Sequence, residues 1–363
     1  MRQPILYVAI TNHGFGHATR TAAVVAAIQE LCPEIIVIMV TTAPRWLLEA
    51  YLPDQFIYRP RAFDIGVVQS DSITMNRAAT LEKLRDIKAR QAATIASEVS
   101  FIKQNRVELI FADIPPLVGA IAKAAGVPCW MASNFGWDLI YRDWGGEFEP
   151  IADWISDCFS KCDRLFRLPF HEPMSAFPVI EDIGLTGGNP RYPSADLRRD
   201  FNITSPPEKT VLLTFGGLGL AQIPYEGLKR FSDWQFVTFD KAAPELPNLV
   251  KIPGHQYRPI DVMPLCSRVV SKPGYSTFAE ACRLDIPIIS IEREGFAEAP
   301  LLIDGIRDYA HHIILEGSEL NEDSWAFLEQ DPNPPRSGTS LPTDGNEAIA
   351  QAVVDYFQSI GAL

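Results

Sequence analysis

Short runs of consecutive apolar residues recur along the chain, and each is followed by a segment with helical spacing. The first two runs cover residues 5–10 and 35–40. A continuous apolar run of this length is typical of a central parallel strand whose two faces are both covered. After the first run, Ala22, Val25 and Ile28 recur at three-residue spacing, which predicts an amphipathic helix. Strands that alternate with helices predict an α/β fold with a parallel sheet.

The same alternation continues in the second half of the chain. Further strands are expected at 56–58, 109–111, 128–133, 210–215, 236–239, 268–270, 287–291 and 312–315. Prolines and glycines interrupt the pattern between residues 168 and 204, as is typical of a connection between domains. We therefore predict an N-terminal Rossmann-like domain at 1–168 and a linker at 169–204. A C-terminal Rossmann-like domain is expected at 205–345 and a final helix at 346–363.

Composition and charge exclude several classes of function. The chain has 363 residues, 47% of them hydrophobic, and a formal net charge of −13. Such a charge argues against nucleic acid or an anionic membrane surface as the main partner. We expect no transmembrane segment and a cytoplasmic location, because no apolar run approaches the length of a membrane span. The six cysteines are scattered, which favours buried reduced thiols over a zinc site.

The segment 271–280 is the first candidate for ligand chemistry. An apolar strand leads into a turn with Pro273 and Gly274, and a helix is expected from 277 to 284. The backbone N–H groups and the dipole at the start of such a helix suit a phosphate. Glu280, one turn further on, could accept hydrogen bonds from a diol such as a ribose. The alternative is structural: Thr277 caps the helix and Glu280 completes a capping box.

A second strand-turn-helix segment, 11–20, follows the first apolar run and contains His13, Gly14, Gly16 and His17. It lacks the third glycine and the acidic residue of a dinucleotide fingerprint, so NAD is not expected. Parallel sheets bind ligands at the carboxyl ends of their strands. The polar residues at the expected strand ends of this half are His13, His17, Asp113, Asn134 and Asp138.

Together these motifs resemble the GT-B glycosyltransferases, in particular the MurG-like and UDP-glycosyltransferase branch. The glycine turns at 13–17 and 216–219 and the Gly-x-x-Thr-x-x-Glu motif at 274–280 carry this resemblance. Segments 13–20, 133–138 and 272–275 look more narrowly like the glycosyltransferase-like N-terminal domain of L-arabinokinase proteins. The resemblance implies two doubly wound parallel-sheet domains that face a central cleft. It also implies a nucleotide-sugar donor held by the C-terminal domain and an acceptor held by the N-terminal domain.

The resemblance also assigns donor-binding residues. Glu280 would bind the donor ribose and Glu298 the hydroxyls of its sugar. The diphosphate would lie against Gly216, Gly217, Gly274, Tyr275, Ser276 and Thr277. UDP is the favoured nucleotide, and no metal and no cofactor are expected. Departures from the family pattern at Lys272 and around Glu298 leave the identity of the sugar open.

For catalysis, the resemblance implies an inverting, metal-independent transfer with His17 as general base and Asp113 as its orienting partner. An imidazole suits the removal of a proton from an acceptor hydroxyl. His13 lies at the same strand end and is the alternative base. The residues expected on the acceptor side are His13, Gly14, Gly16, Asn134, Trp137 and Asp138.

Two other functions remain open at this stage. A non-catalytic sensor or partner subunit that binds a sugar nucleotide would need Glu280 but neither His17 nor Asp113. A sugar-nucleotide 2-epimerase shares the architecture but would need additional acidic residues in the site. The acceptor and the oligomeric state do not follow from the sequence.

Overall fold

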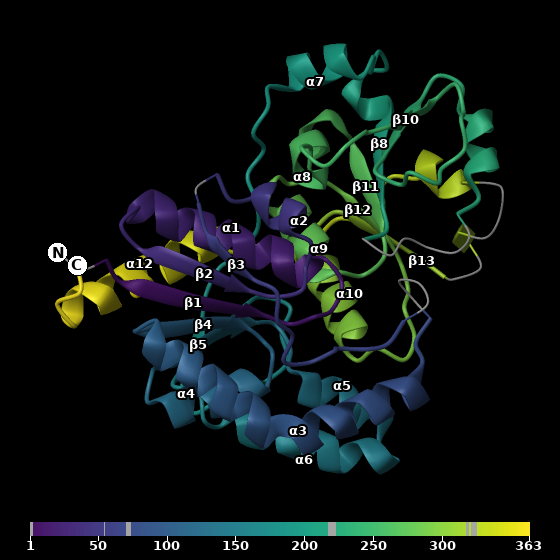
Figure 1. Ribbon diagram of the computed structural model, residues 1–363. Coiled ribbons are helices and arrows are strands. Elements are labelled where there is room, and N and C mark those ends of the chain that lie inside the picture. Colours follow the sequence, from purple (N-terminus) through teal and green to yellow (C-terminus); the bar gives the residue numbers. More distant parts are fainter. Residues whose placement is uncertain (1–2, 54, 70–73, 217–222, 317–318, 321–324) are drawn as a thin grey trace. The chain divides into compact units, whose positions relative to one another are not determined.

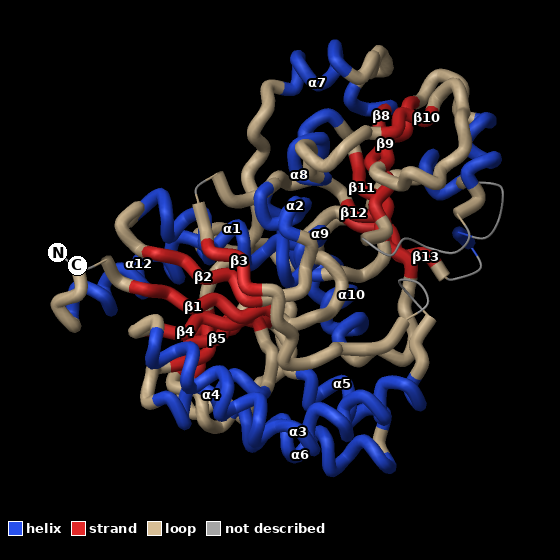
Figure 2. The backbone as a smooth tube through the Cα atoms, in the orientation of Figure 1, coloured by secondary structure: helices blue, strands red, loops and turns tan. Residues whose placement is uncertain are grey.

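The chain divides into two units, each built on one parallel sheet with helices around it (Figures 1 and 2). The computed structural model describes residues 3–53, 55–69, 74–216, 223–316, 319–320 and 325–363. The first unit contains the described residues up to 69, residues 75–187 and residues 342–363. The second contains residue 74 and the described residues from 188 to 341.

The first sheet has seven strands in the order β3-β2-β1-β4-β5-β6-β7, all parallel. Their bounds are β1 (Ile5–Ile10), β2 (Ile36–Val40), β3 (Ile57–Arg59), β4 (Leu109–Asp113), β5 (Cys129–Ser133), β6 (Arg164–Arg167) and β7 (Ile180–Asp182). The strand order reverses between β1 and β4, where Ile10 is in register with Asp113. In doubly wound sheets ligands bind outside such a reversal point.

Helices cover both faces of this sheet (Figure 1). One face carries α1 (Gly16–Leu31), α2 (Arg45–Glu49) and α12 (Gly345–Ser359), and the other carries α3 (Arg77–Gln104), α4 (Leu117–Ala125) and α6 (Glu149–Phe159). The helix α5 (Trp137–Trp144) and a short 3₁₀ helix (Gly146–Phe148) connect β5 to α6. Successive residues of β1 face opposite sides, as strand geometry requires. Leu6 and Val8 pack in the core under α1, whereas the Tyr7 hydroxyl donates to Glu98 of α3 at 2.9 Å.

The second sheet has six parallel strands in the order β10-β9-β8-β11-β12-β13. Their bounds are β8 (Thr210–Thr214), β9 (Gln235–Thr238), β10 (Leu249–Lys251), β11 (Arg268–Ser271), β12 (Ile288–Ile291) and β13 (His312–Leu315). The helices are α7 (Ser194–Asp200), α8 (Pro259–Val262), α9 (Tyr275–Arg283) and α10 (Glu298–Tyr309), with 3₁₀ helices at Pro207–Lys209, Tyr225–Arg230, Met263–Leu265 and Ala326–Glu329. Within the described ranges, no helix of either unit is both long and apolar enough to cross a membrane.

The predicted α/β class with two doubly wound parallel sheets is confirmed, with three short strands added. The sequence pattern did not predict β6, β7 or β10. β6 begins and ends with arginine, two of the three residues of β7 are acidic, and β10 has three residues at the edge of its sheet. Such strands lack the continuous apolar run by which buried central strands are recognised.

The helix after β11 begins two residues earlier than the pattern predicts, at Tyr275 rather than Thr277. Gly274 occupies the N-cap position and no side chain caps the helix. Thr277 therefore lies inside the first turn, and Glu280 lies beyond the position at which a capping box would need it. The structural alternative for these two residues is wrong.

The C-terminal helix α12 is an integral part of the core of the first unit. Ile349, Val353 and Phe357 are completely buried in the same cluster as the apolar face of α1. Their spacing of four residues places them along one side of the helix. The last described segment of the chain thus completes the layer that covers one face of the first sheet.

We expect Phe357→Ala to lower the free energy of unfolding of the first unit by about 3–5 kcal/mol, because the phenyl ring leaves a cavity in a fully buried cluster. The measurement is urea unfolding followed by circular dichroism. Gln358→Ala changes the exposed neighbour on the same helix and should alter the value by less than about 0.5 kcal/mol. Equal effects of the two substitutions would contradict this packing.

Candidate active site

Three neighbouring strands of the first sheet end in polar residues that meet at one edge. His17 follows β1 at the start of α1, Asp113 is the last residue of β4, and Asn134 follows β5 directly. The strands lie side by side in the order β1, β4, β5. Because they are parallel, their carboxyl ends share one edge. Three residues predicted from the sequence are thereby brought together at the reversal point of the strand order.

The carboxylate of Asp113 is the centre of this group. Arg20 binds it through two N–H groups, with Nε donating to Oδ2 at 2.6 Å and Nη2 donating to Oδ1 at 2.7 Å. The Thr21 hydroxyl donates to Oδ2 at 2.9 Å, and His17 Nδ1 lies 2.9 Å from Oδ1. Asp113 is 1% exposed and Arg20 is 4% exposed. Two-pronged pairs of this kind are among the strongest side-chain hydrogen bonds.

Electrostatics keeps Asp113 ionised in spite of its burial. Burial alone would raise the pKa of Asp113, because it disfavours the charged form. The Arg20 guanidinium and His17 act in the opposite direction and hold the pKa of Asp113 well below its usual range. Both oxygens of Asp113 therefore act only as hydrogen-bond acceptors at neutral pH.

The surrounding donors decide which ring nitrogen of His17 carries the proton. Nδ1 lies 2.9 Å from Asp113 Oδ1 and 3.0 Å from Arg20 Nη2. Nη2 has two hydrogens, which Asp113 Oδ1 and Ser133 Oγ accept at 2.7 and 3.1 Å. Since the carboxylate cannot donate, the proton between His17 and Asp113 is assigned to Nδ1. Nε2 then carries the lone pair, and no described residue hydrogen-bonds to it.

His13, the alternative base, is held in a different way. Its Nδ1 accepts the backbone N–H of Val67 at 3.3 Å. Its ring stands edge-on to Trp137, with centroids 5.0 Å apart and an interplanar angle of 81°. A neutral imidazole whose Nδ1 is an acceptor carries its proton on Nε2. Of the two histidines, the geometry favours His17 as the group that can take up a proton.

A second buried carboxyl, Asp64, lies close to this group. Its two oxygens accept the Thr11 hydroxyl and, at 2.8 Å, the Asn12 backbone N–H. Thr11 Oγ1 in turn accepts the indole N–H of Trp137 at 2.9 Å. Burial raises the pKa of Asp64 to about 6, although both hydrogen bonds and His17 oppose the rise. The site therefore holds a carboxyl group that changes its charge just below neutral pH.

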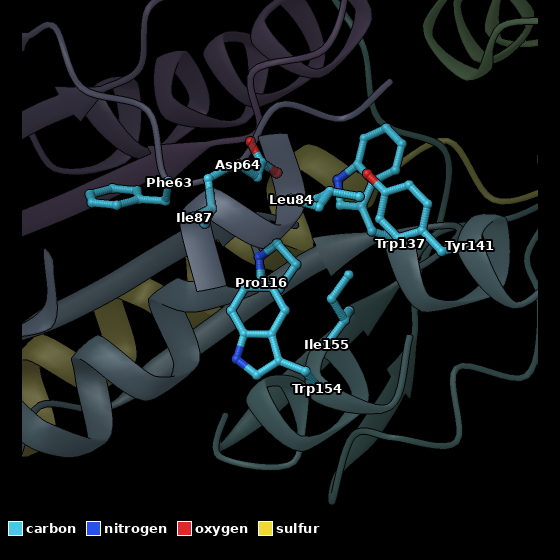
Figure 3. A pocket seen from close by; sticks show the side chains of 9 residues that line it. All are labelled: Phe63, Asp64, Leu84, Ile87, Pro116, Trp137, Tyr141, Trp154 and Ile155. Atoms are coloured by element: carbon cyan, nitrogen blue, oxygen red, sulfur yellow. The ribbon is translucent and has the colours of Figure 1, made fainter. Parts of the chain in front are cut away.

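An aromatic layer lies beside Asp64. Trp137 and Tyr141 are buried and stack with centroids 6.0 Å apart. Figure 3 shows them with Asp64 around a cavity of about 10 Å³, which is also lined by Phe63, Leu84, Ile87, Pro116, Trp154 and Ile155. A cavity of this size holds at most one water molecule. The layer therefore supports Asp64 and Trp137, and it does not form a ligand pocket of its own.

The remaining residues predicted for the acceptor side take different places. Gly14 and Gly16 are exposed in the turn that begins α1, and Gly14 has a φ of +59°, a conformation that favours glycine. Trp137 is completely buried. Asp138 is directed to α6, where its Oδ2 accepts the Ser156 hydroxyl at 2.8 Å, and burial raises its pKa.

The predicted donor residues gather at the corresponding edge of the second sheet. Strands β8, β11 and β12 are neighbours there. Gly216 follows β8 with a φ of +79°, Gly274 lies between β11 and α9, and Glu298 is the first residue of α10 after β12. Gly217, which was predicted beside Gly216, lies outside the described residues.

The first turn of α9 is a candidate anion site. It consists of Tyr275, Ser276 and Thr277, and Gly274, which has no side chain, occupies the N-cap position before it. The hydroxyl oxygen of Ser271, a residue only 1% exposed at the end of β11, has no hydrogen-bond partner among the described residues. Backbone N–H groups, the helix dipole and this hydroxyl are donors of the kind that bind phosphate.

Lys272 adds a positive charge beside this turn. Its Nζ lies 3.4 Å from the carbonyl oxygen of Pro273, and a Cβ atom on Gly274 would lie 3.6 Å from it. Burial, together with Arg293, lowers the pKa of Lys272 to about 8, while Glu298 acts in the opposite direction. The start of α9 therefore faces a cation that loses its charge in mildly alkaline solution.

Glu280 is 4% exposed in α9. Its Oε1 accepts the backbone N–H of Gly188 at 3.0 Å, and Arg283 donates to the carbonyl oxygen of the same glycine at 2.8 Å. Burial raises the pKa of Glu280 to about 7, although Gly188, Arg258 and Arg283 oppose the rise. Glu280 thus carries a buried carboxyl group that is only partly ionised at neutral pH.

Sequence reasoning missed Arg20, Thr21 and Ser133, which complete the surroundings of Asp113. Arg20 follows His17 by three residues, so that both side chains lie on one side of α1. A cation one turn after His17 is the signal that could have identified it. Lys272 was noticed as part of the segment 272–275 and as a departure from a family pattern, but no role was predicted for its charge.

Comparison with known proteins agrees with this architecture. No protein-family model matches the chain. The chain is 28% identical over 333 residues to L-arabinokinase of Arabidopsis thaliana, a match that covers 88% of this chain. It covers 31% of that protein, so the chain spans about a third of the length of this curated relative.

Solved structures resemble the chain over nearly its whole length. UGT89C1 of Arabidopsis thaliana, complexed with quercetin, has a TM-score of 0.61 at 12% identity and covers 98% of this chain and 90% of its own. UGT71G1 of Medicago truncatula, complexed with UDP-glucose, has a TM-score of 0.58 at 13% identity, and the match covers 96% of this chain and 93% of that one. The glycosyltransferase VinC, complexed with DTDP, has a TM-score of 0.57 at 14% identity, and the match covers 98% of this chain and 95% of that one. The predicted GT-B fold and the predicted resemblance are confirmed.

We expect Asp64→Asn to change how stability depends on pH. The pKa of Asp64 is higher in the folded than in the unfolded chain, so this group contributes less stability as the pH rises from about 4 to 6. Relative to Asp64→Asn, the wild type should lose roughly 2–3 kcal/mol of unfolding free energy across that range. Urea unfolding at several pH values measures the difference. Asp143→Asn, which changes an exposed carboxyl, is the control, and its unfolding free energy should depend on pH in the same way as that of the wild type. The same pH dependence in Asp64→Asn as in the wild type would contradict the raised pKa of Asp64.

Proposed function

We propose that this protein is a metal-independent, inverting glycosyltransferase that moves a sugar from a nucleotide-diphosphate sugar to a hydroxyl acceptor. UDP is the favoured nucleotide. The observation that carries the proposal is the buried contact of 2.9 Å between His17 Nδ1 and Asp113 at the reversal point of the first sheet. The GT-B fold, and the UDP-glucose and DTDP bound by two structures of that fold, support the donor class.

In the proposed reaction, the acceptor oxygen forms a bond to the anomeric carbon while the bond from that carbon to the diphosphate breaks. The nucleoside diphosphate leaves with the electron pair, and the acceptor proton passes to His17 Nε2. The Nδ1 proton stays on the His17 ring and is donated to Asp113 in a hydrogen bond, and the negative charge of Asp113 stabilises the imidazolium that forms. This assignment uses the nitrogen that carries the lone pair.

For the donor, we assign the diphosphate to the start of α9, with Lys272 as the nearest positive charge and the Ser271 hydroxyl as an additional donor. Glu280 and Glu298 are the acceptors assigned to donor hydroxyl groups. Leaving-group charge grows as the sugar–oxygen bond breaks, so groups that stabilise it would act mainly in the transition state.

A sensor that binds a sugar nucleotide without reaction would need the features of the second unit only. Nothing in such a function would require His17 to present an acceptor nitrogen beside an ionised Asp113. The enzyme is therefore the better supported of the two functions, and separate measurements of binding and turnover distinguish them.

We expect His17→Ala and Glu280→Ala to affect different steps. With UDP-glucose and a panel of hydroxyl acceptors, His17→Ala should lower the release of UDP by about 100-fold or more, because the base is lost. It should leave the rise in melting temperature with UDP unchanged, since the nucleotide is assigned to the second unit. Glu280→Ala should reduce that rise.

His171→Ala, which replaces an exposed histidine of the same unit, is the control and should retain both properties. A panel of UDP, GDP, ADP and TDP identifies the base. Full turnover by His17→Ala would contradict the assignment of His17 as the general base. Binding of UDP without turnover in the wild type, across all acceptors, would favour the sensor.

The charge of Lys272 gives a second prediction. Because its pKa is lowered to about 8, the free protein loses this cation as the pH rises through 8, and the affinity for UDP should fall several-fold between pH 7 and 9. Lys272→Arg keeps a positive charge over the whole range and should flatten the dependence. Isothermal titration calorimetry measures both. An equally steep pH dependence in Lys272→Arg would exclude Lys272 as its source.

A further inference from the structure

Arg20 is a buried guanidinium that connects three strand ends. It follows β1 on α1, and it donates to Asp113 at the end of β4 and to Ser133 and Asn134 at the end of β5. Its Nη1 donates to Asn134 Oδ1 at 2.9 Å. The planar fork of an arginine holds five N–H donors in fixed directions on three nitrogens, whereas the three donors of a lysine ammonium share one nitrogen.

The charges around His17 show what this guanidinium does. Asp113 faces the ring from β4, Arg20 faces it from α1, Asp64 acts on it from the segment after β3, and the His13 ring lies 6.5 Å away. The other neighbours of the ring are aromatic: Phe135 at 5.8 Å and Trp137 at 6.2 Å between centroids. Arg20 is the cation that directly pairs with Asp113.

A general base must be neutral before the reaction begins. An unpaired buried carboxylate next to an imidazole favours the protonated ring, because opposite charges stabilise each other strongly away from water. Such a ring could no longer accept a proton from a substrate. With Arg20 bound to Asp113, the two side chains carry no net charge between them.

We propose that Arg20 is a positioning residue of this site, which fixes Asp113 as an acceptor for the Nδ1 proton of His17 and offsets its charge so that the ring stays neutral. This role rests on the proposed function of His17 as the base. Arg20 touches neither acceptor nor donor in this assignment, and it acts through Asp113. Its bond to Asn134 Oδ1 also sets the orientation of that amide, whose two N–H donors then point elsewhere.

The test requires no substrate. The chain has six histidines, so protein labelled with ¹⁵N-histidine gives few ring signals, and His17→Ala identifies those of residue 17. Long-range ¹H–¹⁵N spectra at different pH values report the protonated nitrogen and the titration midpoint of each ring. We expect the wild-type ring of His17 to carry its proton on Nδ1, and Arg20→Gln to move its midpoint up by about one pH unit or more.

Two variants separate this role from a merely structural one. Arg20→Lys keeps the charge but loses the fork, so the midpoint should stay near the wild-type value while both tautomers appear. Arg45→Gln removes an exposed cation of the same unit, with a side chain 56% exposed, and should change neither property. The proton on Nε2 in the wild type, or an unchanged midpoint in folded Arg20→Gln, would overturn the inference.

If Arg20→Gln does not fold, Arg20→Lys decides the question, because a single Nδ1–H tautomer in that variant would exclude a positioning role for the fork. The spectra are independent of turnover, so failure of the transferase proposal and failure of this inference give different results. Where UDP release is measurable, the acidic limb of its pH profile should move upward in Arg20→Gln together with the His17 midpoint.

Discussion

The ion pair between Arg20 and Asp113 is the interaction on which the site in the first unit depends. Both groups are almost completely buried, and each would be costly without the other. Removal of one partner from such a pair typically costs about 3–5 kcal/mol, because the remaining charge has no compensation. The pair joins the start of α1 to the end of β4, and the Ser133 and Asn134 bonds extend it to β5. The same contacts therefore hold the strand ends together and orient the ring of His17.

The topology explains why both units place their polar residues at one edge. Each sheet begins in the middle, winds outward, and returns to the other side of its first strand. The carboxyl ends of the two strands that flank this return, β1 with β4 and β8 with β11, lie next to each other without a helix between their ends. In the first unit the edge holds an imidazole and the carboxylate that it contacts. In the second it holds the start of a helix and a lysine. The two units thus carry different polar groups at the carboxyl ends of strands that are arranged in the same way.

The parts of the fold that depend on continuous burial could be predicted from the sequence. The strand expected at 5–10 agrees with β1, because both its sides are covered and its residues are apolar throughout. The strand expected at 312–315 agrees with β13, where three apolar residues follow His312. β6 could not be recognised, since it begins and ends with arginine. For the site, strand-end positions identified His17, Asp113 and Asn134. The role of Arg20 could not be predicted, because a cation inside a helix forms its ion pairs through tertiary contacts that helical periodicity does not encode.

The position of α12 has a consequence for the order in which the chain folds during its synthesis. The second unit is encoded almost entirely between residues 188 and 341, whereas the first needs residues 342–363 to complete the helix layer that contains α1. At typical rates of translation, roughly 8–30 s separate the emergence of residue 187 from that of residue 342. During this interval, Val25 and Ile28 of α1 lack the neighbours that bury them in the finished protein. The nascent first unit therefore leaves part of this apolar cluster without its α12 neighbours until the last residues of the unit have been made.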